Sequence, residues 1–334
     1  MKSHIHKLHN RENLTQSEIE DVMGEIMAGK IPENDIASFL LALREKGPTV
    51  DEITGAARIL RQFVIGIKTK HKDILDTCGT GGDKKNTFNI STITALVVAG
   101  AGAIVAKHGN RSISSRCGSA DILEAVGVNL NVEERRLGEC LDEVGIAFLF
   151  AQRLHPAMKN VAAVRKKLGV ETIFNILGPL TNPAAATHQL MGVYAADLVE
   201  PMARVLKNLG LKRAMVVHGS DGLDEITLTA KSFISEYDGR EIISYDISPE
   251  ETGFPLARPR DLEGGDLAAN VRILEGVLNG KKGPQRDIVV LNSAYALYTA
   301  EKAGSIKEGI ALAEDSIDSG KALRKLNDLR KFTN

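Results

Sequence analysis

The strongest chemical signal in the sequence is a glycine-rich segment, DTCGTGGD, at residues 76–83. Its three glycines in four positions, Gly79, Gly81 and Gly82, leave backbone N–H groups free to converge on an anion. The segment is neither a Walker loop nor a dinucleotide fingerprint, because no Gly-Lys-Ser/Thr ends it and Lys84 occupies the third glycine position of GxGxxG. Taken alone, the segment fits a phosphate-binding loop and a glycine-rich turn equally well.

Four short polar side chains follow this segment, at the start of an expected helix: Thr87, Asn89, Ser91 and Thr92. Helix N-termini bind phosphates through free N–H groups, and hydroxyl groups extend that reach. Ordinary helix capping would need only one of the four side chains. The cluster therefore favours phosphate binding over a simple turn.

A second polar segment, KHGNRSISS at residues 107–115, follows an apolar strand. Lys107 and Arg111 supply positive charge, Asn110 supplies an amide, and Gly109 lets the chain pass close to a ligand. So polar a run directly after a buried strand is more typical of a binding loop than of a connector. Ser119 opens the next helix, either as a cap or as a phosphate ligand.

An acidic pair, Asp224-Glu225, lies in the segment GSDGLDEI after another expected strand. Carboxylates close to bound phosphates favour Mg²⁺ shared between protein and substrate, whereas without the phosphate loops a charged turn is the better interpretation.

His155 and Pro156 open a helix that carries Arg165. A lone His or Arg is most often structural, so Arg165 becomes interesting only if its helix faces the phosphate loops.

Two kinds of segment must position these loops. The first seventy residues read as helices, beginning with a capping box from Thr15 to Glu18. From residue 74 onward, short apolar runs alternate with amphipathic helices, which predicts a mostly parallel sheet with ligands at the carboxyl ends of its strands. Residues 227–245 indicate a hairpin with its turn at 238–239. The expected strands cover residues 74–76, 103–107, 146–150, 189–194, 214–218 and 288–291.

The composition narrows the range of partners. The chain has 334 residues with 42 basic and 43 acidic side chains, so a formal net charge of −1 gives no general attraction for nucleic acid or anionic membranes. Aromatic residues make up only 4%, too few for many base-stacking platforms. The three cysteines form no CxxC pair, and the N-terminus is too polar for a signal peptide, so we expect a reduced, cytoplasmic protein.

Taken together, these segments resemble the anthranilate phosphoribosyltransferases, which belong to the nucleoside phosphorylase and phosphoribosyltransferase superfamily. Further matching segments are GSADILEAVG at 118–127, HPAMK at 155–159, NILGPLTNP at 175–183 and GPQRDIVVLNSAYALY at 283–298. The resemblance covers nearly the whole chain. Each segment alone is weakly specific, but the set in this order is strongly specific.

The resemblance implies an α/β fold, with a small N-terminal helical domain and a larger α/β domain whose mostly parallel central sheet is flanked by helices. The helical domain would comprise residues 1–70, joined by a mid-chain helical segment at about 160–188, and the phosphoribosyl pyrophosphate-binding domain residues 71–334. It implies a homodimer and a reaction of tryptophan biosynthesis, in which the amine of anthranilate displaces pyrophosphate from 5-phosphoribosyl 1-pyrophosphate.

The resemblance also implies roles for individual residues. Ser91 and Glu225 would bind one Mg²⁺, and Asp224 with Glu225 a second, so that each subunit holds two. Anthranilate would contact Gly79, Asn110 and Arg165, with His108, His155 and the Gly178-Pro179 turn lining its approach. Phosphoribosyl pyrophosphate would be bound by Gly79, Gly82, Asp83, Thr87, Asn89, Ile90, Ser91, Thr92, Lys107, His108, Gly109, Asn110, Arg111, Ser112, Ile113, Ser114, Ser115 and Ser119.

Some questions stay open from the sequence. Gln152 and Met158 stand where the family commonly has proline and tyrosine, which affects the expected aryl pocket but not the reaction. No residue is assigned as a catalytic base, because the arylamine is neutral at pH 7, and His108 is only a candidate proton acceptor. The alternatives are a pyrimidine nucleoside phosphorylase, which would not need the acidic pair, and a non-catalytic nucleic-acid-binding relative.

Overall fold

The computed structural model describes residues 1–83, 85–111 and 117–334. The predictions for Ser112, Ile113, Ser114 and Ser115 therefore lie outside the described residues.

The N-terminal part of the chain is helical, as the sequence predicts. Thr15 accepts a hydrogen bond from the N–H of Glu18 while the Glu18 side chain bonds back to Thr15, and Thr49 and Glu52 repeat this capping box. The apolar face of each helix is buried against its neighbours. The four helices are α1 (Lys2–His9), α2 (Gln16–Met27), α3 (Glu33–Lys46) and α4 (Val50–Gln62).

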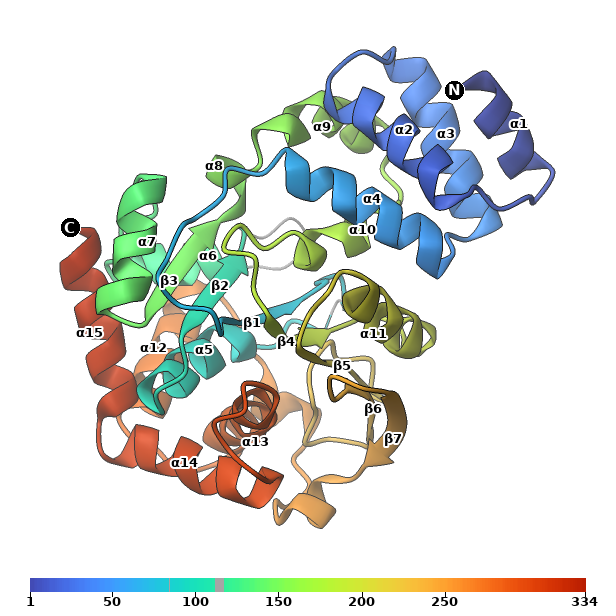
Figure 1. The fold of residues 1–334 in the computed structure, drawn as a ribbon. Coiled ribbons are helices and arrows are strands. Elements are labelled where there is room, and N and C mark those ends of the chain that lie inside the picture. The colour runs from blue at the N-terminus through green and yellow to red at the C-terminus, as the bar shows by residue number, and fades with distance from the viewer. Residues whose placement is uncertain (84, 112–116) are drawn as a thin grey trace.

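A mid-chain segment returns to these helices. It contains α8 (Ala151–Leu154), α9 (Lys159–Leu168), α10 (Phe174–Leu177) and the short 3₁₀ turns at Pro156–Met158 and Gly178–Leu180. Helix α9 packs against α2 and α3, and α10 packs against α4 (Figure 1). Two parts of the sequence that are about 100 residues apart thus share one hydrophobic core.

Seven strands form one sheet in the order β3-β2-β1-β4-β5-β6-β7. The first five strands in this order are parallel, and β6 and β7 are antiparallel, as the predicted hairpin requires. The strand order changes direction between β1 and β4, and such a switch point is where open α/β sheets bind ligands. The strands are β1 (Leu75–Gly79), β2 (Val105–Gly109), β3 (Ile146–Phe150), β4 (His188–Gly192), β5 (Arg213–Gly219), β6 (Ser232–Tyr237) and β7 (Ile242–Ile247).

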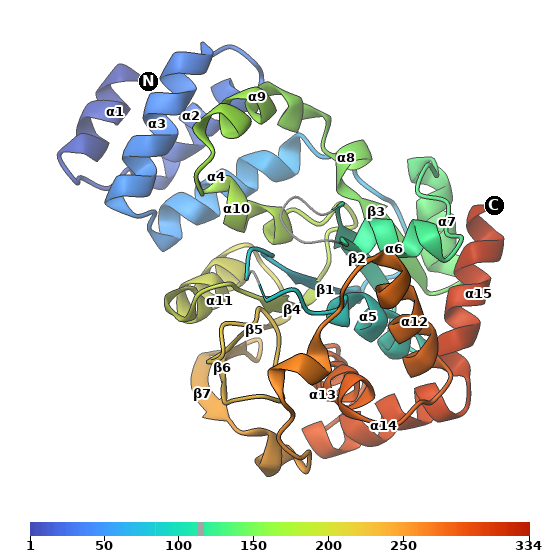
Figure 2. The same ribbon diagram turned by 180° about the vertical axis from the view of Figure 1, so that it is seen from behind.

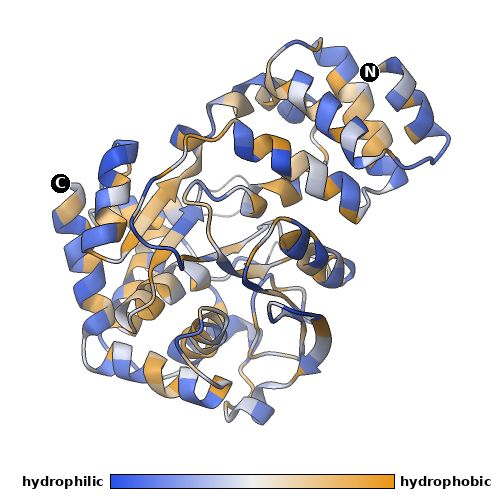
Figure 3. Ribbon diagram, viewed as in Figure 1, coloured by the Kyte–Doolittle hydropathy of each residue, from blue (hydrophilic) through white to orange (hydrophobic). Residues whose placement is uncertain are grey.

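The two faces of the sheet belong to two different hydrophobic cores. Along β5, Met215 and Val217 pack into one core, whereas Ala214 and Val216 pack into the core that includes the N-terminal helices. This alternation is the two-residue period of a strand that is buried on both faces. Figure 3 shows a largely hydrophobic β3, whereas hydrophilic and hydrophobic residues alternate along many of the helices.

Helices cover both faces of the sheet (Figure 2). Helix α5 packs against β1, β2, α13 and α15, and α11 packs against β5, β6 and α4. Further short 3₁₀ turns lie at Ala196–Leu198, Pro249–Thr252 and Pro259–Leu262. The remaining helices are α5 (Ile90–Gly100), α6 (Ser119–Ala125), α7 (Glu134–Glu143), α11 (Val199–Asn208), α12 (Leu267–Leu278), α13 (Pro284–Thr299), α14 (Ile306–Asp318) and α15 (Lys321–Thr333).

One predicted strand is wrong. Residues 288–291 lie inside the helix α13, which is buried almost all round, so a continuous apolar run occurs without a strand. Four apolar residues cannot distinguish a buried helix from a buried strand by periodicity.

Among the described helices, none combines the length and the apolar character that crossing a membrane would require.

Candidate functional site

The acidic pair lies at the switch point between β1 and β4. One carboxylate oxygen of Asp224 accepts a hydrogen bond from the N–H of Gly81 at 2.9 Å, and Glu225 accepts one from the N–H of Ser91 at 3.1 Å. Burial and the charge of Asp83 raise the pKa of Asp224 to about 7. Burial and the charge of Asp224 raise the pKa of Glu225 well above its ordinary value. Asp83, Asp224 and Glu225 thus concentrate negative charge beside the glycine-rich segment.

Two glycines at the ends of adjacent strands make room for this pair. Gly79 of β1 lies directly opposite Gly192 of β4. A Cβ on Gly79 would lie 2.3 Å from the Asp224 carboxylate, and a Cβ on Gly192 would lie 1.6 Å from the Asp224 carbonyl oxygen. No side chain fits at either position. The glycine-rich segment then turns away through Gly81 and Gly82, both with positive φ.

A buried lysine lies behind the acidic pair. Lys107 of β2 is 3% exposed, and its Nζ donates to the carbonyl oxygen of Thr77 at 2.6 Å and to Oγ of Ser91 at 3.2 Å. Burial lowers its pKa, while the charges of nearby acids, Asp76 first, oppose that change. Lys107 therefore links β2, β1 and the first turn of α5, where the sequence predicts a phosphate site.

The other predicted side chains of the first α5 turn point in different directions. Asn89 donates to Asn270 and to the carbonyl oxygen of Cys117, and Ile90 is buried in the core. Thr87 forms an isolated bridge with Glu263. The hydroxyl of Thr92 is buried without a hydrogen-bond partner among the described residues. The N–H of Ile90 already donates to the carbonyl oxygen of Phe88 at 2.7 Å, so it is not free for a ligand, whereas the Thr92 hydroxyl has no partner among the described residues.

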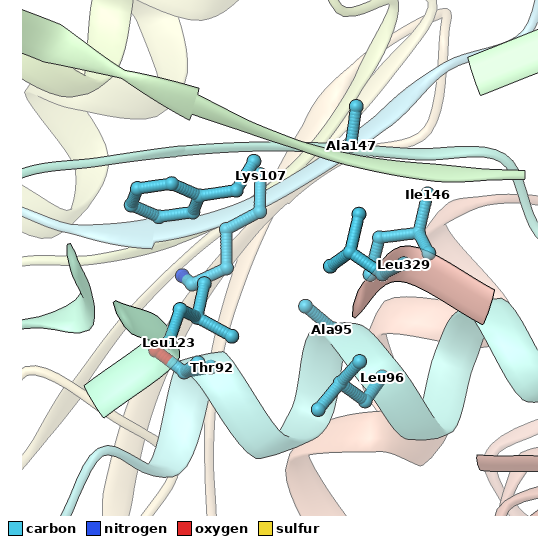
Figure 4. Close-up of a pocket in the computed structure, with 9 residues that line it drawn as sticks. Thr92, Ala95, Leu96, Lys107, Leu123, Ile146, Ala147 and Leu329 are labelled. Atoms are coloured by element: carbon cyan, nitrogen blue, oxygen red, sulfur yellow. The ribbon is translucent and has the colours of Figure 1, made fainter. Parts of the chain in front are cut away.

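A small, mainly apolar pocket explains the environment of Thr92. It lies between α5 and the strands β2 and β3, and Thr92 and Lys107 are the only polar side chains among its described lining residues (Figure 4). Apolar pockets of this kind form part of the core rather than a polar binding site. The remaining lining residues are Ala95, Leu96, Leu123, Ile146, Ala147, Phe148 and Leu329.

The two residues that directly follow β2, Asn110 and Arg111, contact α6. Arg111 forms ion pairs with Asp121 at 2.9 Å and with Glu124 at 2.8 Å, and hydrogen bonds to Glu124 and Asp121 raise its pKa. Ser119 donates from its hydroxyl to the carbonyl oxygen of Asn110, so it does not act as a side-chain cap. A Cβ on Gly109 would meet Ser119 Oγ at 2.3 Å. The positive charge of Arg111 is thus already neutralised on α6.

Two histidines join the sheet to the mid-chain segment. The Nε2 atoms of His108 on β2 and His155 before α9 lie 3.0 Å apart. Burial lowers the pKa of His108 to about 3 and that of His155 to about 4, and a hydrogen bond to the Gly178 backbone opposes this for His108. Both imidazoles are therefore neutral at pH 7. His108, His155 and Gly178, predicted to line one route, do lie together.

Arg165 lies on α9, with its guanidinium 5.5 Å from the centre of the Phe174 ring. Burial lowers its pKa, and within the described part of the chain the guanidinium forms neither a hydrogen bond nor an ion pair. Met158 is partly buried two turns earlier, whereas Gln152 is exposed. Arg165 is thus not bonded to Gly79, the last residue of β1, or to Asn110, the residue after β2.

The residues that support these groups are not predicted by any sequence motif. Asp76 is fully buried and accepts hydrogen bonds from the N–H of His108 at 3.1 Å and from Asn182 at 2.8 Å, so it holds β2 and the mid-chain turn together. Gly192 packs closely against the carbonyl of Asp224, and Asn292 binds the peptide that follows Glu225. These roles depend on contacts between segments that are distant in sequence, so no local sequence pattern predicts them.

Comparison with known proteins agrees with this architecture over the whole chain. Residues 71–323 match the model of the glycosyl transferase family, a/b domain, and residues 2–64 match that of the glycosyl transferase family, helical bundle domain. An anthranilate phosphoribosyltransferase of Acetivibrio thermocellus is 53% identical over 334 residues, covering 100% of this chain and 97% of that protein.

Two solved structures are similar across their full length. The crystal structure of anthranilate phosphoribosyltransferase from Thermus thermophilus has a TM-score of 0.94 and 42% identity, covering 99% of both chains. The anthranilate phosphoribosyltransferase of Saccharomyces cerevisiae in complex with PRPP and Mg has a TM-score of 0.91 and 28% identity, covering 99% of this chain and 97% of that chain.

Proposed function

The chain belongs to the anthranilate phosphoribosyltransferase family of glycosyl transferases, and we propose that it acts on the substrates of that family. The enzyme transfers the phosphoribosyl group of 5-phosphoribosyl 1-pyrophosphate (PRPP) to the amine of anthranilate, giving N-(5-phosphoribosyl)anthranilate and pyrophosphate in L-tryptophan biosynthesis. The observation that carries this proposal is the position of Asp224 and Glu225, which are held against the glycine-rich segment at the switch point of the sheet.

PRPP would lie along the carboxyl ends of β1 and β2. The glycine-rich segment and the first turn of α5 meet at this edge, where the N–H groups of Gly81 and Ser91 donate to Asp224 and Glu225, and Lys107 supplies a positive charge next to Ser91. Arg111 can contribute to phosphate binding only if PRPP competes with Asp121 and Glu124 for its guanidinium. The predicted set of PRPP ligands, including Ser119, stays a prediction on these grounds.

The carboxylates fit a divalent cation that is shared with substrate. Burial and the charge of Asp83 raise the pKa of Asp224, burial and the charge of Asp224 raise that of Glu225, and a bound cation would neutralise this negative charge. The described residues contain no group of three or more His, Cys, Asp or Glu side chains that could hold a metal alone. Mg²⁺ commonly binds one or two carboxylates and completes its shell with substrate phosphates and water.

We therefore propose two Mg²⁺ per subunit, one held by Ser91 and Glu225 and one by Asp224 and Glu225. The support for the first is that Glu225 already reaches the N–H of Ser91. When bound, such ions stabilise negative charge that develops on the leaving pyrophosphate. Lys107, whose Nζ lies 3.2 Å from Oγ of Ser91, is positioned to stabilise the same charge.

Anthranilate would approach from the mid-chain segment. Its carboxylate needs a cation, and the guanidinium of Arg165 has no acidic partner among the residues that the structure describes. Gly79 and Asn110 would complete the contacts at the sheet edge. Because the arylamine is neutral at pH 7, positioning dominates over base catalysis. His108 could accept a proton only by exchanging its contact with His155 or with Gly178.

The proposal extends to the organisation of the protein. We propose a helical domain of residues 1–70 together with about 160–188, an α/β domain of residues 71–334, and a cytoplasmic homodimer that binds neither nucleic acid nor membrane. The packing of α9 against α2 and α3 and of α10 against α4 supports this division, and the boundary between the two matched family models lies near residue 70.

A fluorescence assay tests the proposed reaction. Purified protein is mixed with anthranilate, PRPP and MgCl₂, and the loss of anthranilate fluorescence is followed over time. We expect a loss only when all three components are present, and full turnover in excess chelator would contradict the metal requirement. Phosphorolysis of a pyrimidine nucleoside without anthranilate turnover would favour the phosphorylase alternative, and salt-dependent retention on DNA would favour the nucleic-acid-binding one.

A further inference from the structure

We propose that Asn292 on α13 is a positioning residue for the Asp224-Glu225 pair, and through it for the divalent cation of the proposed reaction. This inference rests on the proposed function. Asn292 belongs to the C-terminal segment at residues 283–298, whose side chains touch no substrate in that proposal. The acidic pair follows β5, so the proposal connects two segments that are about 66 residues apart.

The side-chain amide of Asn292 binds both polar atoms of one residue's backbone. Its Oδ1 accepts a hydrogen bond from the N–H of Ile226 at 3.0 Å, and its Nδ2 donates to the carbonyl oxygen of Ile226 at 2.8 Å. Nδ2 also donates to the Ile288 carbonyl in its own helix at 2.9 Å, which fixes the orientation of the amide. Asn292 is fully buried, so removing its amide would leave the buried N–H and carbonyl of Ile226 without a partner, which destabilises the folded state.

Ile226 directly follows Glu225, and no strand ladder supports this stretch of chain. The side chain of Ile226 is fully buried, and both its backbone groups depend on Asn292. Helix α13 packs beneath β4 and β5, where both overall views place it (Figures 1 and 2). The amide therefore acts as a substitute for a neighbouring strand at the residue after the acidic pair.

The sheet restrains the same short segment on the residue before. The carbonyl of Asp224 lies so close to Gly192 that a Cβ there would be 1.6 Å away. Asp224 thus packs against the end of β4, and Ile226 is hydrogen-bonded to α13. Glu225 lies between these two restrained residues. The carboxylates are held in place before any cation arrives, as expected for a site that stabilises charge by preorganisation.

A metal-binding measurement with Asn292→Leu tests this role. Leucine has the same branching and the same number of side-chain heavy atoms, although it is larger, and it leaves the N–H and carbonyl of Ile226 unpaired. We measure Mn²⁺ binding in the presence of pyrophosphate by electron paramagnetic resonance, together with thermal unfolding. Because supporting residues around a metal site typically contribute about 10- to 100-fold to its affinity, we expect Mn²⁺ binding weakened by about 10-fold or more.

Ser316→Ala provides a matched control. Ser316 is also fully buried, and its hydroxyl donates to the carbonyl oxygen of Val97 at 2.7 Å, which joins α14 to α5 away from the acidic pair. This variant should lower the unfolding temperature and leave Mn²⁺ binding unchanged. If Asn292→Leu does not accumulate as folded protein, Asn292→Ser, which is smaller and polar, is measured in the same way with the same expectation.

The inference is overturned if the folded Asn292 variants lose thermal stability but bind Mn²⁺ with pyrophosphate as tightly as the unchanged protein. It is also overturned if the unchanged protein does not bind this probe. The proposed function can fail separately, because a protein that binds Mn²⁺ with pyrophosphate but transfers nothing to anthranilate would contradict the reaction and leave the role of Asn292 intact.

Discussion

The two ends of the proposed site are held in different ways. At the sheet edge, Asp224 and Glu225 each accept a backbone N–H, two glycines fix the space around Asp224, and α13 binds the following peptide. At the mid-chain end, the Arg165 guanidinium rests only over the Phe174 ring, without a hydrogen bond or ion pair among the described residues. The protein itself holds the acidic pair in place, whereas no described residue forms an ion pair with Arg165.

This difference indicates how the work of the site is divided. Groups that stabilise charge in the transition state are most effective when they need no reorganisation, which matches the fixed sheet edge. A group that selects the acceptor molecule needs its opposite charge only when that molecule is bound. We therefore expect changes at the sheet edge to act on the rate, and changes at Arg165 to act on the apparent affinity for anthranilate.

The largest effect is expected from the double change Asp224→Asn and Glu225→Gln. It removes both negative charges that would hold the cation, while the side-chain sizes stay the same. We expect kcat/KM for PRPP to fall by about 10³-fold, because electrostatic groups at a reacting centre typically contribute this much. Initial rates are measured over a range of MgCl₂ concentrations. Asp261→Asn, which alters an exposed turn paired with Arg258, is the control, and near-normal turnover of the double variant would refute the metal site.

A smaller effect is expected from Gly192→Ala. The new methyl group would overlap the carbonyl of Asp224 and force the acidic segment away from β4. A displacement of about 1 Å at a reacting centre can cost about 10²-fold in rate, so we expect kcat to fall by that order. Circular dichroism confirms that the variant is folded before its rate is measured.

Gly24→Ala is the matched control for this substitution. Gly24 lies inside α2 with no atom within 4 Å of a new Cβ, so alanine should leave the rate unchanged and stabilise the helix by about 0.5–1 kcal/mol. Equal rates for the two alanine variants would mean that the close packing of Asp224 against Gly192 does not affect catalysis.

Arg165→Gln should affect anthranilate alone. A charge-assisted hydrogen bond contributes about 1.5–3 kcal/mol, so we expect the KM for anthranilate to rise by about 10- to 100-fold with little change in the KM for PRPP. Lys166→Gln alters an exposed neighbour on the same helix and serves as the control. Unchanged anthranilate kinetics in Arg165→Gln would remove this residue from the site.

Local patterns were sufficient for much of the fold. The strand at 146–150 is predicted with its observed bounds, because a short β-prone run ends there at a polar segment. The run at 288–291 is equally apolar, yet it lies in a helix, because α13 is buried on nearly all sides and shows no amphipathic period. The error therefore comes from burial, which a single segment does not encode.

The residues of the candidate site also fall into those that local sequence patterns predict and those that depend on tertiary contacts. The glycine-rich segment, the acidic pair and the basic segment at residue 107 are detectable because their unusual residue types are adjacent in sequence. The pairing of Arg111 with Asp121 and Glu124 was not predicted, because it depends on where α6 lies. Gly192 and Asn292 were missed for the same reason, since each acts on a loop that only the folded chain brings close.

The smallest predicted effect concerns the histidines that join the two ends. Burial lowers the pKa of His155 from 6.5 to about 4, so the folded protein resists its protonation while the unfolded chain accepts a proton below about pH 6.5. Stability is therefore fully present above about pH 6.5 and is lost as the pH falls toward 4, by about 1.4 kcal/mol per pH unit. Urea unfolding of the protein and of His155→Gln is compared at about pH 7.5 and about pH 5.5, which lie on either side of the unfolded pKa.

We expect His155→Gln to lose less of its stability between these pH values, by about 1.4 kcal/mol, because glutamine does not titrate. The comparison must be made between variants, since the raised pKa of Asp224 acts in the opposite direction and favours the folded state as the pH falls below 7. His9→Gln, at the exposed end of α1, is the matched substitution. The same loss of stability in the protein and in His155→Gln would show that the histidine contact between the sheet and the mid-chain segment is not maintained in solution.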